Sequence, residues 1–554
     1  MASKKAENQL GYDLDQSPVE LAGHPQQVHP LPPKASSPPV LFWSLRDQAL
    51  RGSVKDWLQS ALPKKLRLQE EGSHEFRNRY LDTQDWRLWS SDRVLVHRQR
   101  NGGHYLSSWQ SGVGEWFVEQ AVDGQPVLPA DLPHGAIGRH LPQWLGLRGL
   151  IAMAETTDRL RVLRVLDGED KTVALLEIHE ERNERGPLEP WLWLRAVRGY
   201  RDEARRISRN LYRQLGLEPL ARDPLLYALA DGPRQAGDYT GKLRLRLRPD
   251  TRADRAARQV LLTLLDAVED NVAGACEAID TEFLHDLRVA VRRSRSFLAG
   301  VKGVLPETRI GRFRDGLSWL QGVTGEGRDL DVYLLDFPRF RQSLSADQAE
   351  ALEPFRDFLI EARARAYAEL AGHSRGKRFQ TLVRDWRAFL QGPVPRRSPL
   401  RHAMRPIGEV ARLRIAKAWK RVLTDGGVIT RESPAEALHE LRKRCKRLRY
   451  LMEFFAGLFD SDAIGNQIRA LKRLQEVLGE FQDRQVQHDR ILDFERAMKA
   501  ADRLPEPTAQ AMEALAAGLI RDQDAVRERF YVRFAAFSAK KERKAFRAML
   551  VGKS

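Results

Sequence analysis

Two stretches of the chain each carry a histidine followed by positively charged residues at helical spacing. The first reads FLHDLRVAVRRSRSFL (283–298), and the second reads ALHELRKRCKRLRYLM (437–452). Both place the histidine and three cations at i, i+3, i+7 and i+10, as His285, Arg288, Arg292 and Arg295 and again as His439, Arg442, Lys446 and Arg449. On an α-helix this spacing puts the four side chains on one face. Because like charges at this spacing repel, the pattern favours an anion bound along that face.

The two stretches are copies of one another. The histidines are 439 − 285 = 154 residues apart, and the same offset lays the segment 320–332 on 474–486 without a gap. Residues identical at this offset include Leu320, Gln321, Gly325, Glu326 and Asp329, which fall on Leu474, Gln475, Gly479, Glu480 and Asp483. We infer an internal duplication, and we expect two matched halves related by a pseudo-two-fold axis.

The cations predict phosphate binding rather than catalysis or metal binding. Arginine contacts phosphate through a bidentate fork and lysine acts as a point charge. No histidine or cysteine stands four residues after either histidine, so we predict no metal site there. The chain has no Ser-His-Asp spacing, Walker loop or HExxH motif, so no catalytic residue is assigned. We expect Asp329, Asp331 and Asp483, which follow probable helix breaks at Gly325 and Gly479, to cap or to pair with the cations.

Composition supports a polyanionic partner. The 554 residues contain 92 Lys plus Arg against 75 Asp plus Glu, a formal charge of +17, which favours nucleic acid, polyphosphate or an anionic membrane. Two cysteines make neither a disulfide framework nor a zinc site. With no long apolar run and no signal-peptide pattern, we expect a soluble, non-secreted, cytoplasmic protein.

The elements that position these residues fall into two domains after a leader. Residues 1–37 are rich in Pro, Ser, Gln and Lys and predict a disordered leader. Residues 38–232 predict an α+β domain of antiparallel strands, at VLFWSL, DRVLVHRQR, GGHYLSSWQ, RLRVLRVLD, TVALLEIHEE and EPWLWLRAVR, closed by a helix at 201–217. A link at 233–242 leads to 243–551, where the 3.6-residue period predicts an all-α domain of two helical bundles.

The helical region resembles the CHAD family, the conserved-histidine α-helical domains. The motifs that carry the resemblance are HDLRVAVRRSRSFL, GEGRDLDV, LHELRKRCKRLRY and LKRLQEVLGEFQD, in order in both halves. The resemblance implies two pseudo-symmetric four-helix bundles with a basic groove that binds inorganic polyphosphate, and some members associate with polyphosphate granules. By motif the ligand-facing residues would be the two columns named above. Their neighbours Arg293, Lys443, Arg447 and Lys472 are further candidates.

The preceding domain is similar to the CYTH family, the triphosphate-tunnel fold. The resemblance rests on Tyr80, Asp82 and Thr83 in YLDTQDWRL, on Arg98 and Arg100, and on Glu177 in LLEIHEE. The family opens with a Glu-x-Glu-x-Lys strand that holds metal and triphosphate, whereas VLFWSL has neither acid nor lysine, and the hairpin carries Ser107, Ser108, Trp109 and Gln110 in place of Thr-x-Lys. Magnesium needs carboxylate oxygens. We therefore expect a degenerate, catalytically silent CYTH-like domain, with scaffolding or weak anion contact as its role.

These observations predict a polyphosphate-binding protein that uses no cofactor. The alternatives are a nucleic-acid-binding protein that uses the same basic surface, and a triphosphatase that acts through the CYTH-like domain. The basic helices lack the interleaved aromatic residues that read single-stranded nucleic acid, which favours polyphosphate. We expect no membrane partner.

Overall fold

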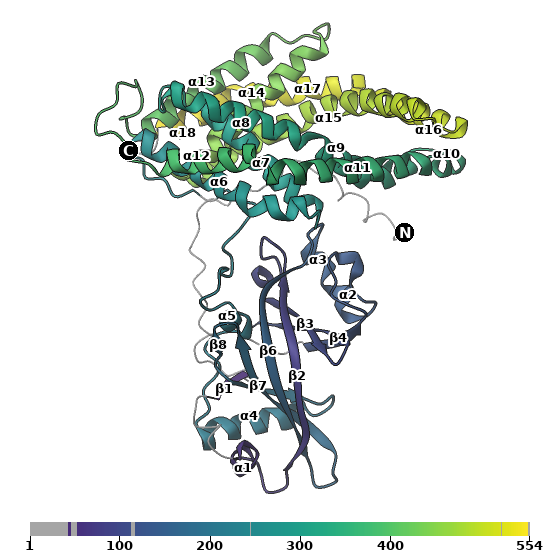
Figure 1. Cartoon of the computed structure of the whole chain (residues 1–554). Coiled ribbons are helices and arrows are strands. Elements are labelled where there is room, and N and C mark those ends of the chain that lie inside the picture. Colours follow the sequence, from purple (N-terminus) through teal and green to yellow (C-terminus); the bar gives the residue numbers. More distant parts are fainter. Residues whose placement is uncertain (1–41, 46–52, 112–116, 244, 522, 552–554) are drawn as a thin grey trace. The chain divides into compact units, whose positions relative to one another are not determined.

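The computed structural model describes residues 42–45, 53–111, 117–243, 245–521 and 523–551. They form two compact units, one within 24–240 and one from 241 onward, which we call the sheet unit and the helical unit (Figure 1). An antiparallel α+β domain followed by an all-helical domain was predicted and is confirmed. The leader predicted at 1–37 lies outside the described residues. No helix in the described part of the chain is long and apolar enough to cross a membrane.

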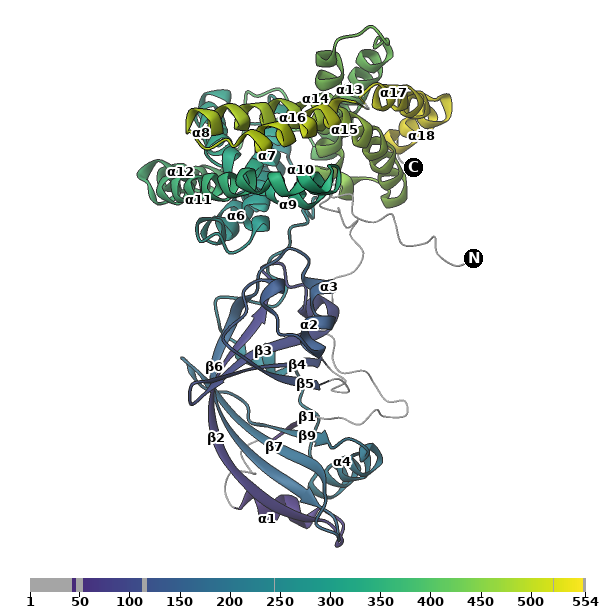
Figure 2. The ribbon, with the colours of Figure 1, turned by 90° about the vertical axis from the view of Figure 1, so that its right-hand side faces the viewer.

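The sheet unit is built on one antiparallel sheet in the order β1-β9-β7-β6-β2-β3-β4-β5, with β8 paired to β7. The strands are β1 (Phe42–Ser44), β2 (Arg67–Asp82), β3 (Arg93–Arg100), β4 (Gly103–Gln110), β5 (Phe117–Val122), β6 (Ile151–Leu166), β7 (Thr172–Asn183), β8 (Gly186–Pro187) and β9 (Trp191–Ala196). Figure 2 shows β2 and β6 as long curved strands that run the length of the sheet.

Strand β2 was not predicted, although it lies at the centre of the sheet. Its first half carries mostly exposed charged and polar residues, with Leu68 as a buried exception, and burial becomes frequent only in its second half, from Phe76 onward. A register shift between Glu70 and Gly72, where Gly72 has φ of +144°, bends the strand against β6. Only glycine adopts this backbone region without strain.

The sheet unit also contains short helices, and each face of its sheet has its own core cluster. The helices are α1 (Val54–Ser60), α2 (Ala136–His140), α3 (Pro142–Leu145), α4 (Arg201–Leu215) and α5 (Pro224–Ala228), with 3₁₀ turns η1 (Trp89–Ser91) and η2 (Pro129–Asp131). On one face, α1 and α4 bury Leu58 and Ile207 against strands β6, β7 and β9. The other face buries aromatic residues, among them Trp109, Trp191 and Trp193. Large aromatic side chains therefore form a second core cluster on this face of the sheet.

The helical unit contains long helices packed largely as antiparallel neighbours. They are α6 (Ala253–Cys276), α7 (Thr281–Gly300), α8 (Glu307–Val323), α9 (Gly325–Gln342), α10 (Ala346–Ala351), α11 (Glu353–Arg375), α12 (Lys377–Gln391), α13 (Ile407–Gly427), α14 (Ala435–Phe454), α15 (Ser461–Ala500), α16 (Glu506–Ile520), α17 (Gln523–Ser538) and α18 (Lys540–Val551), with the 3₁₀ turn η3 (Ala456–Leu458). Figures 1 and 2 show α10 and α16 side by side at one end of the unit, where Thr508 Oγ1 donates to the Ala351 carbonyl at 2.8 Å.

The duplication is present in the structure at the same offset as in the sequence. Helices α6 and α7 begin at 253 and 281, and α13 and α14 begin at 407 and 435, so both pairs are related by 407 − 253 = 435 − 281 = 154 residues. Residues 154 apart also touch one another. Arg252 forms a β-bridge with Pro406, and Tyr333 Oη donates to the Gln487 carbonyl at 3.5 Å. Contacts between equivalent residues mark the pseudo-two-fold axis.

The two copies differ at the predicted helix breaks. In the first copy α8 ends at Val323 and α9 begins at Gly325, with Thr324 between them. In the second copy the equivalent segments form the single 40-residue helix α15, which runs through Gly479. The break expected at Gly479 is therefore wrong, because glycine lowers helix stability by only about 1 kcal/mol and burial of the neighbouring Leu478 and Phe481 offsets this.

Candidate functional site

Helices α7 and α14 carry the predicted columns on equivalent faces. Asp280 caps α7, since its Oδ1 accepts from the amides of Glu282 and Phe283 at 2.7 and 3.0 Å. Leu287 and its counterpart Leu441 are 0% and 1% exposed and fix each helix against the core. His285 and His439 lie on the opposite face of each helix, where both are half-buried.

In the first column, protein acceptors hold Arg288 in place. Its Nη1 donates to the Gln321 carbonyl at 3.0 Å and to Thr324 Oγ1 at 3.1 Å, at the α8–α9 break. Burial lowers the pKa of this guanidinium to about 10, Asp329 opposes that change and Arg292 adds to it. Arg288 therefore remains charged at neutral pH, and Arg292 and Arg295 continue the column as half-buried residues.

In the second column, side chains of α15 hold the first two members. His439 Nδ1 lies 2.6 Å from Gln482 Oε1, so Nδ1 carries the hydrogen and Nε2 is left for another partner. Arg442 Nη1 donates to Asp483 Oδ1 at 2.8 Å and to the Gly479 carbonyl at 3.3 Å. The predicted pairing of Asp483 with the column is confirmed. Lys446 follows as a half-buried residue.

The leading arginines of the two columns have equivalent surroundings. A Cβ added at Gly325 would lie 3.5 Å from Arg288 Nη1, and one added at the equivalent Gly479 would lie 3.6 Å from Arg442 Nη2. The duplication therefore preserves the position of the cation relative to the next helix, and not only its sequence.

The columns approach one another at their C-terminal ends, beside the pseudo-two-fold axis. The Arg292 guanidinium lies 6.0 Å from the ring centroid of Tyr450, which belongs to α14. Arg449 lies 5.5 Å from the same ring and 3.6 Å from Glu453. Arg293 reaches the same Glu453 across the axis at 3.8 Å. With exposures of 6% and 3%, Arg293 and Arg449 are buried at this junction, where the single negative charge of Glu453 offsets part of their two positive charges.

The remaining candidates lie at the edge of the second column. Lys443 pairs with Glu440 at 2.7 Å, one turn earlier on α14. Arg447 is exposed and its Nη2 donates to the Ala299 carbonyl of α7. Lys472 is half-buried on α15. The structure thus gathers Arg292, Tyr450, Arg449 and the Arg293–Glu453 pair at one junction, whereas Lys443 and Arg447 are engaged by Glu440 and by the Ala299 carbonyl.

Asp331 serves a different purpose from the cations. It is fully buried, and its carboxylate accepts from Arg363 Nε at 2.6 Å and from Tyr367 Oη at 2.7 Å, both on α11. Burial raises the pKa of Asp331 and the hydrogen bonds oppose that change. This aspartate ties α9 to α11, so a structural role is confirmed, but its partners are residues of α11 and not the cations of the columns as predicted.

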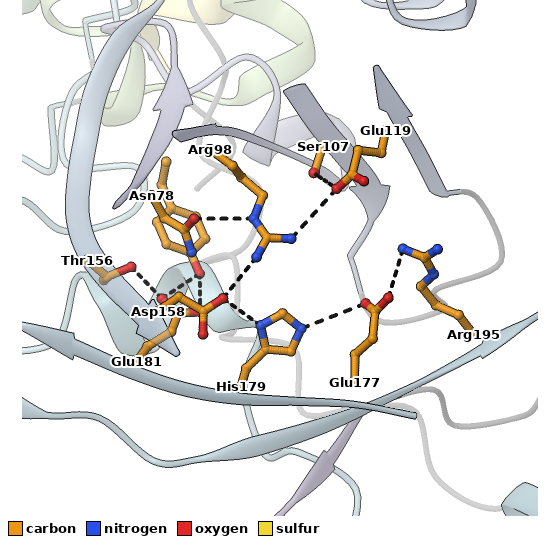
Figure 3. A network of polar contacts seen from close by, with 11 residues as sticks. Asn78, Arg98, Ser107, Glu119, Thr156, Asp158, Glu177, His179, Glu181 and Arg195 are labelled. Carbon is orange, nitrogen blue, oxygen red and sulfur yellow. Dashed lines mark hydrogen bonds and ion pairs between the residues drawn. The ribbon is translucent and has the colours of Figure 1, made fainter. Parts of the chain in front are cut away.

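A second group of polar residues lies inside the sheet unit (Figure 3). Arg98 Nη2 donates to Asp158 Oδ2 at 3.0 Å, and His179 Nδ1 lies 2.8 Å from the same oxygen. Glu181 accepts from Tyr80 Oη at 2.9 Å and from Thr156 Oγ1 at 2.6 Å. All of these side chains are buried. Sequence reasoning pointed to Tyr80 and Arg98 but not to Asp158 or Glu181, which converge from β6 and β7.

The arrangement of this network does not fit a divalent metal. Asp158, His179 and Glu181 place ligand-type atoms within 4.8 Å of one another. However, Asp158 already pairs with Arg98, whose positive charge would repel a cation. The His179 ring stacks on Trp191 at 3.8 Å between centroids, which fills the adjoining space. Asp82 is likewise structural, because its carboxylate accepts from the amides of Thr83, Leu88 and Trp89.

Comparison with known proteins agrees with this geometry. The model of the CHAD domain family matches residues 259–492, which include both columns and the helices that hold them. The helical unit contains a CHAD domain. No curated protein matches the chain.

Several solved structures resemble parts of the chain. The CHAD domain from the plant Ricinus communis is 24% identical, with a TM-score of 0.44, and the match covers 53% of this chain and 95% of that one. PptA from Streptomyces chartreusis is 18% identical, with a TM-score of 0.41, over 51% of this chain and 99% of that one. HpAC1 from Hippeastrum, described as having a dominant triphosphatase activity, is 15% identical, with a TM-score of 0.27, over 36% of this chain and 98% of that one.

Proposed function

We propose that the CHAD domain binds inorganic polyphosphate along the basic faces of α7 and α14. The observation that carries the proposal is the approach of the two columns at the pseudo-two-fold axis, where Arg292 of α7 lies 6.0 Å from the Tyr450 ring of α14. The first column spans ten residues of helix, or about 15 Å, and the second, without the buried Arg449, spans seven residues from His439 to Lys446, or about 10 Å. Cations from both helices can therefore act on one extended anion.

The surroundings of the cations suit a chain of phosphates. Arg288 and Arg442 are oriented by hydrogen bonds to backbone carbonyls at 3.0 and 3.3 Å, so less conformational freedom is lost when an anion binds. Phosphate binding of this kind is driven by counterion release and needs no base recognition. Polyphosphate offers one charge for each repeating unit and no other group.

Nucleic acid is the alternative partner, and the burial of the aromatic residue at the junction argues against it. Tyr450, the aromatic residue between the columns, is 3% exposed. A ring this deeply buried cannot stack on a base, which is the usual contribution of aromatic residues to single-strand binding. In competition, polyphosphate should displace RNA of equal charge, and RNA should displace polyphosphate weakly.

The experiment that tests the proposal is titration of the full chain with long-chain polyphosphate. Replacing the equivalent residues Arg292→Ala and Lys446→Ala should weaken binding by at least tenfold while helix content is unchanged. The matched control is Arg375→Ala with Lys499→Ala, which removes the same charge from exposed positions on α11 and α15. Equal affinity of the two double variants would overturn the proposal.

For the sheet unit we infer a structural role. Its interior carboxylates are engaged by arginine, histidine, tyrosine and threonine side chains. Strand β1 offers Phe42, Trp43 and Ser44, so it supplies no carboxylate for a metal-bound triphosphate.

A further inference from the structure

The duplication is broken at one charged position beside the axis. Arg447 is the counterpart of Arg293, and Ala299 is the counterpart of Glu453, each pair 154 residues apart. In one direction across the axis Arg293 lies 3.8 Å from the Glu453 carboxylate. In the other direction Arg447 lies beside Ala299, whose side chain has no carboxylate, and it donates to the Ala299 backbone carbonyl instead. Arg447 consequently stays exposed, whereas Arg293 is 6% exposed.

Further cations gather around Arg447 at the C-terminal end of α7. Arg414 of α13 donates through Nη2 to the Lys302 carbonyl, just beyond the end of that helix. Arg401 is exposed in the segment between α12 and α13. Burial lowers the pKa of the Arg414 guanidinium, and the positive charges of Arg447 and Arg401 lower it further. Within the described residues, no carboxylate lies within 4.0 Å of the guanidinium nitrogens of these three arginines.

Two buried polar atoms of this cluster, one on His402 and one on Arg414, lack hydrogen-bond partners among the described residues. His402 is 6% exposed, and its backbone amide donates to the Gly303 carbonyl at 3.0 Å, which holds the α12–α13 segment against the end of α7. In the described structure, His402 Nδ1 and Arg414 Nε are buried and have no hydrogen-bond partner. Buried polar atoms normally find a partner, so a ligand or ordered water is expected at this position.

Capping of α7 accounts for only part of the cluster. Cations are favourable at a helix C-terminus, where unpaired carbonyls accumulate, and Arg447 bonds the Ala299 carbonyl in the last turn of α7. Arg414 instead bonds the Lys302 carbonyl, which lies beyond the end of the helix. Among the described residues Arg401 bonds no such carbonyl, yet it directly precedes His402, whose amide is held at the end of α7 by the Gly303 carbonyl. A helix end carries only about half an elementary charge, which does not balance three guanidinium groups.

We propose that Arg401, Arg414 and Arg447, with the buried His402, form a second anion site at the end of α7 that takes a single phosphate group. This phosphate group is either a free phosphate or the terminal phosphate of a polyphosphate chain. The second source is considered because Arg447 directly follows Lys446 of the α14 column. Only the second source rests on the proposed function of the columns.

The test measures binding of orthophosphate, tripolyphosphate and long-chain polyphosphate to the full chain by isothermal titration calorimetry. Arg401→Glu is the informative variant, because it leaves the carbonyl contacts of Arg414 and Arg447 intact and reverses the charge of an exposed residue. Arg397→Glu is the matched control, four residues earlier in the same segment and also exposed. Thermal unfolding of both variants should be unchanged from that of the wild type.

We expect Arg401→Glu to weaken orthophosphate or tripolyphosphate binding by at least tenfold and Arg397→Glu to change it by less than threefold. Loss of orthophosphate binding assigns the site to a free phosphate, and loss for tripolyphosphate alone assigns it to a chain end. Equal affinities for the two variants, or a wild type that binds neither probe, would overturn the second site. The double variant Arg292→Ala with Lys446→Ala separates the proposals, because it should weaken long-chain binding and leave the orthophosphate response in place.

Discussion

Asp483 Oδ1 lies 2.8 Å from Arg442 Nη1, so the first cation of the second column is already paired with an acid of α15. The aspartate is about half exposed, with 52% of its side-chain area accessible. Exposed ion pairs of this kind are worth ~0.2–1 kcal/mol. An anion that binds the column must compete with this carboxylate for Arg442.

Removal of the competing carboxylate should therefore strengthen binding. We predict that Asp483→Asn raises polyphosphate affinity by about two- to fivefold at low salt, the equivalent of one exposed ion pair. Asp489→Asn, which removes an exposed acid six residues later on α15, is the control. Calorimetric titration of both variants checks the prediction, and weaker binding by Asp483→Asn would show that the aspartate orients Arg442 for the ligand.

Salt dependence should report the number of cations that contact the anion. For single-stranded polyanions the logarithm of the affinity falls with the logarithm of salt concentration by about 0.7 for each contact. Removing Arg292 and Lys446 together should therefore reduce the slope by about 1 to 2, whereas Arg375→Ala with Lys499→Ala should leave it unchanged. Titrations at four salt concentrations suffice. An unaltered slope in the first variant would place the anion elsewhere.

The helical unit was predictable because its signals are local and repeated. The 3.6-residue period defined α7 and α14, and the 154-residue offset predicted that their surroundings would match, as the positions of Gly325 and Gly479 beside the leading arginines show. The pairing of Asp483 with Arg442 was predicted, but the helix break at Gly479 on which that prediction was based is absent from α15. These features depend on residues close in sequence or on the comparison of two copies.

The features that were missed depend on contacts between distant segments. Strand β2 was not predicted because its first half, including Glu70 and Glu71, lacks the alternation of a half-buried strand. The burial of Arg449 also could not be read from spacing. Glu453 lies only four residues after Arg449, but the approach of Arg293 to Glu453 from the other half of the domain is a contact between distant segments.

The sheet unit should not hydrolyse triphosphate. We expect the full chain to release no orthophosphate from tripolyphosphate with magnesium or manganese above the rate in buffer, because Arg98 holds Asp158 and β1 supplies no carboxylate. A colorimetric phosphate assay checks this. Metal-dependent release that disappears in Glu177→Gln would show that the interior carboxylates are catalytic after all.

The interior of the sheet unit should make stability depend on pH. Burial, assisted by the negative charge of Asp158, raises the pKa of Glu181 from 4.5 to about 7. The unfolded chain loses this proton near pH 4.5 and the folded chain keeps it until about pH 7, so the folded state binds more protons between these values. The free energy of unfolding contributed by Glu181 is therefore fully present below pH 4.5 and falls as the pH rises through 7. Burial of Asp82, whose pKa is raised to about 7, acts in the same direction.

Glu181→Gln should remove its part of this dependence, because glutamine keeps the shape of the side chain and does not titrate. Between pH 5 and pH 7.5 we expect the urea midpoint to fall by less in Glu181→Gln than in the wild type, when unfolding is followed by tryptophan fluorescence. The exposed Glu184, three residues later, provides the control as Glu184→Gln, which should behave as the wild type does. Parallel pH profiles for the wild type and Glu181→Gln would mean that Glu181 is already ionised at pH 5, held by a positive charge such as that of Arg98.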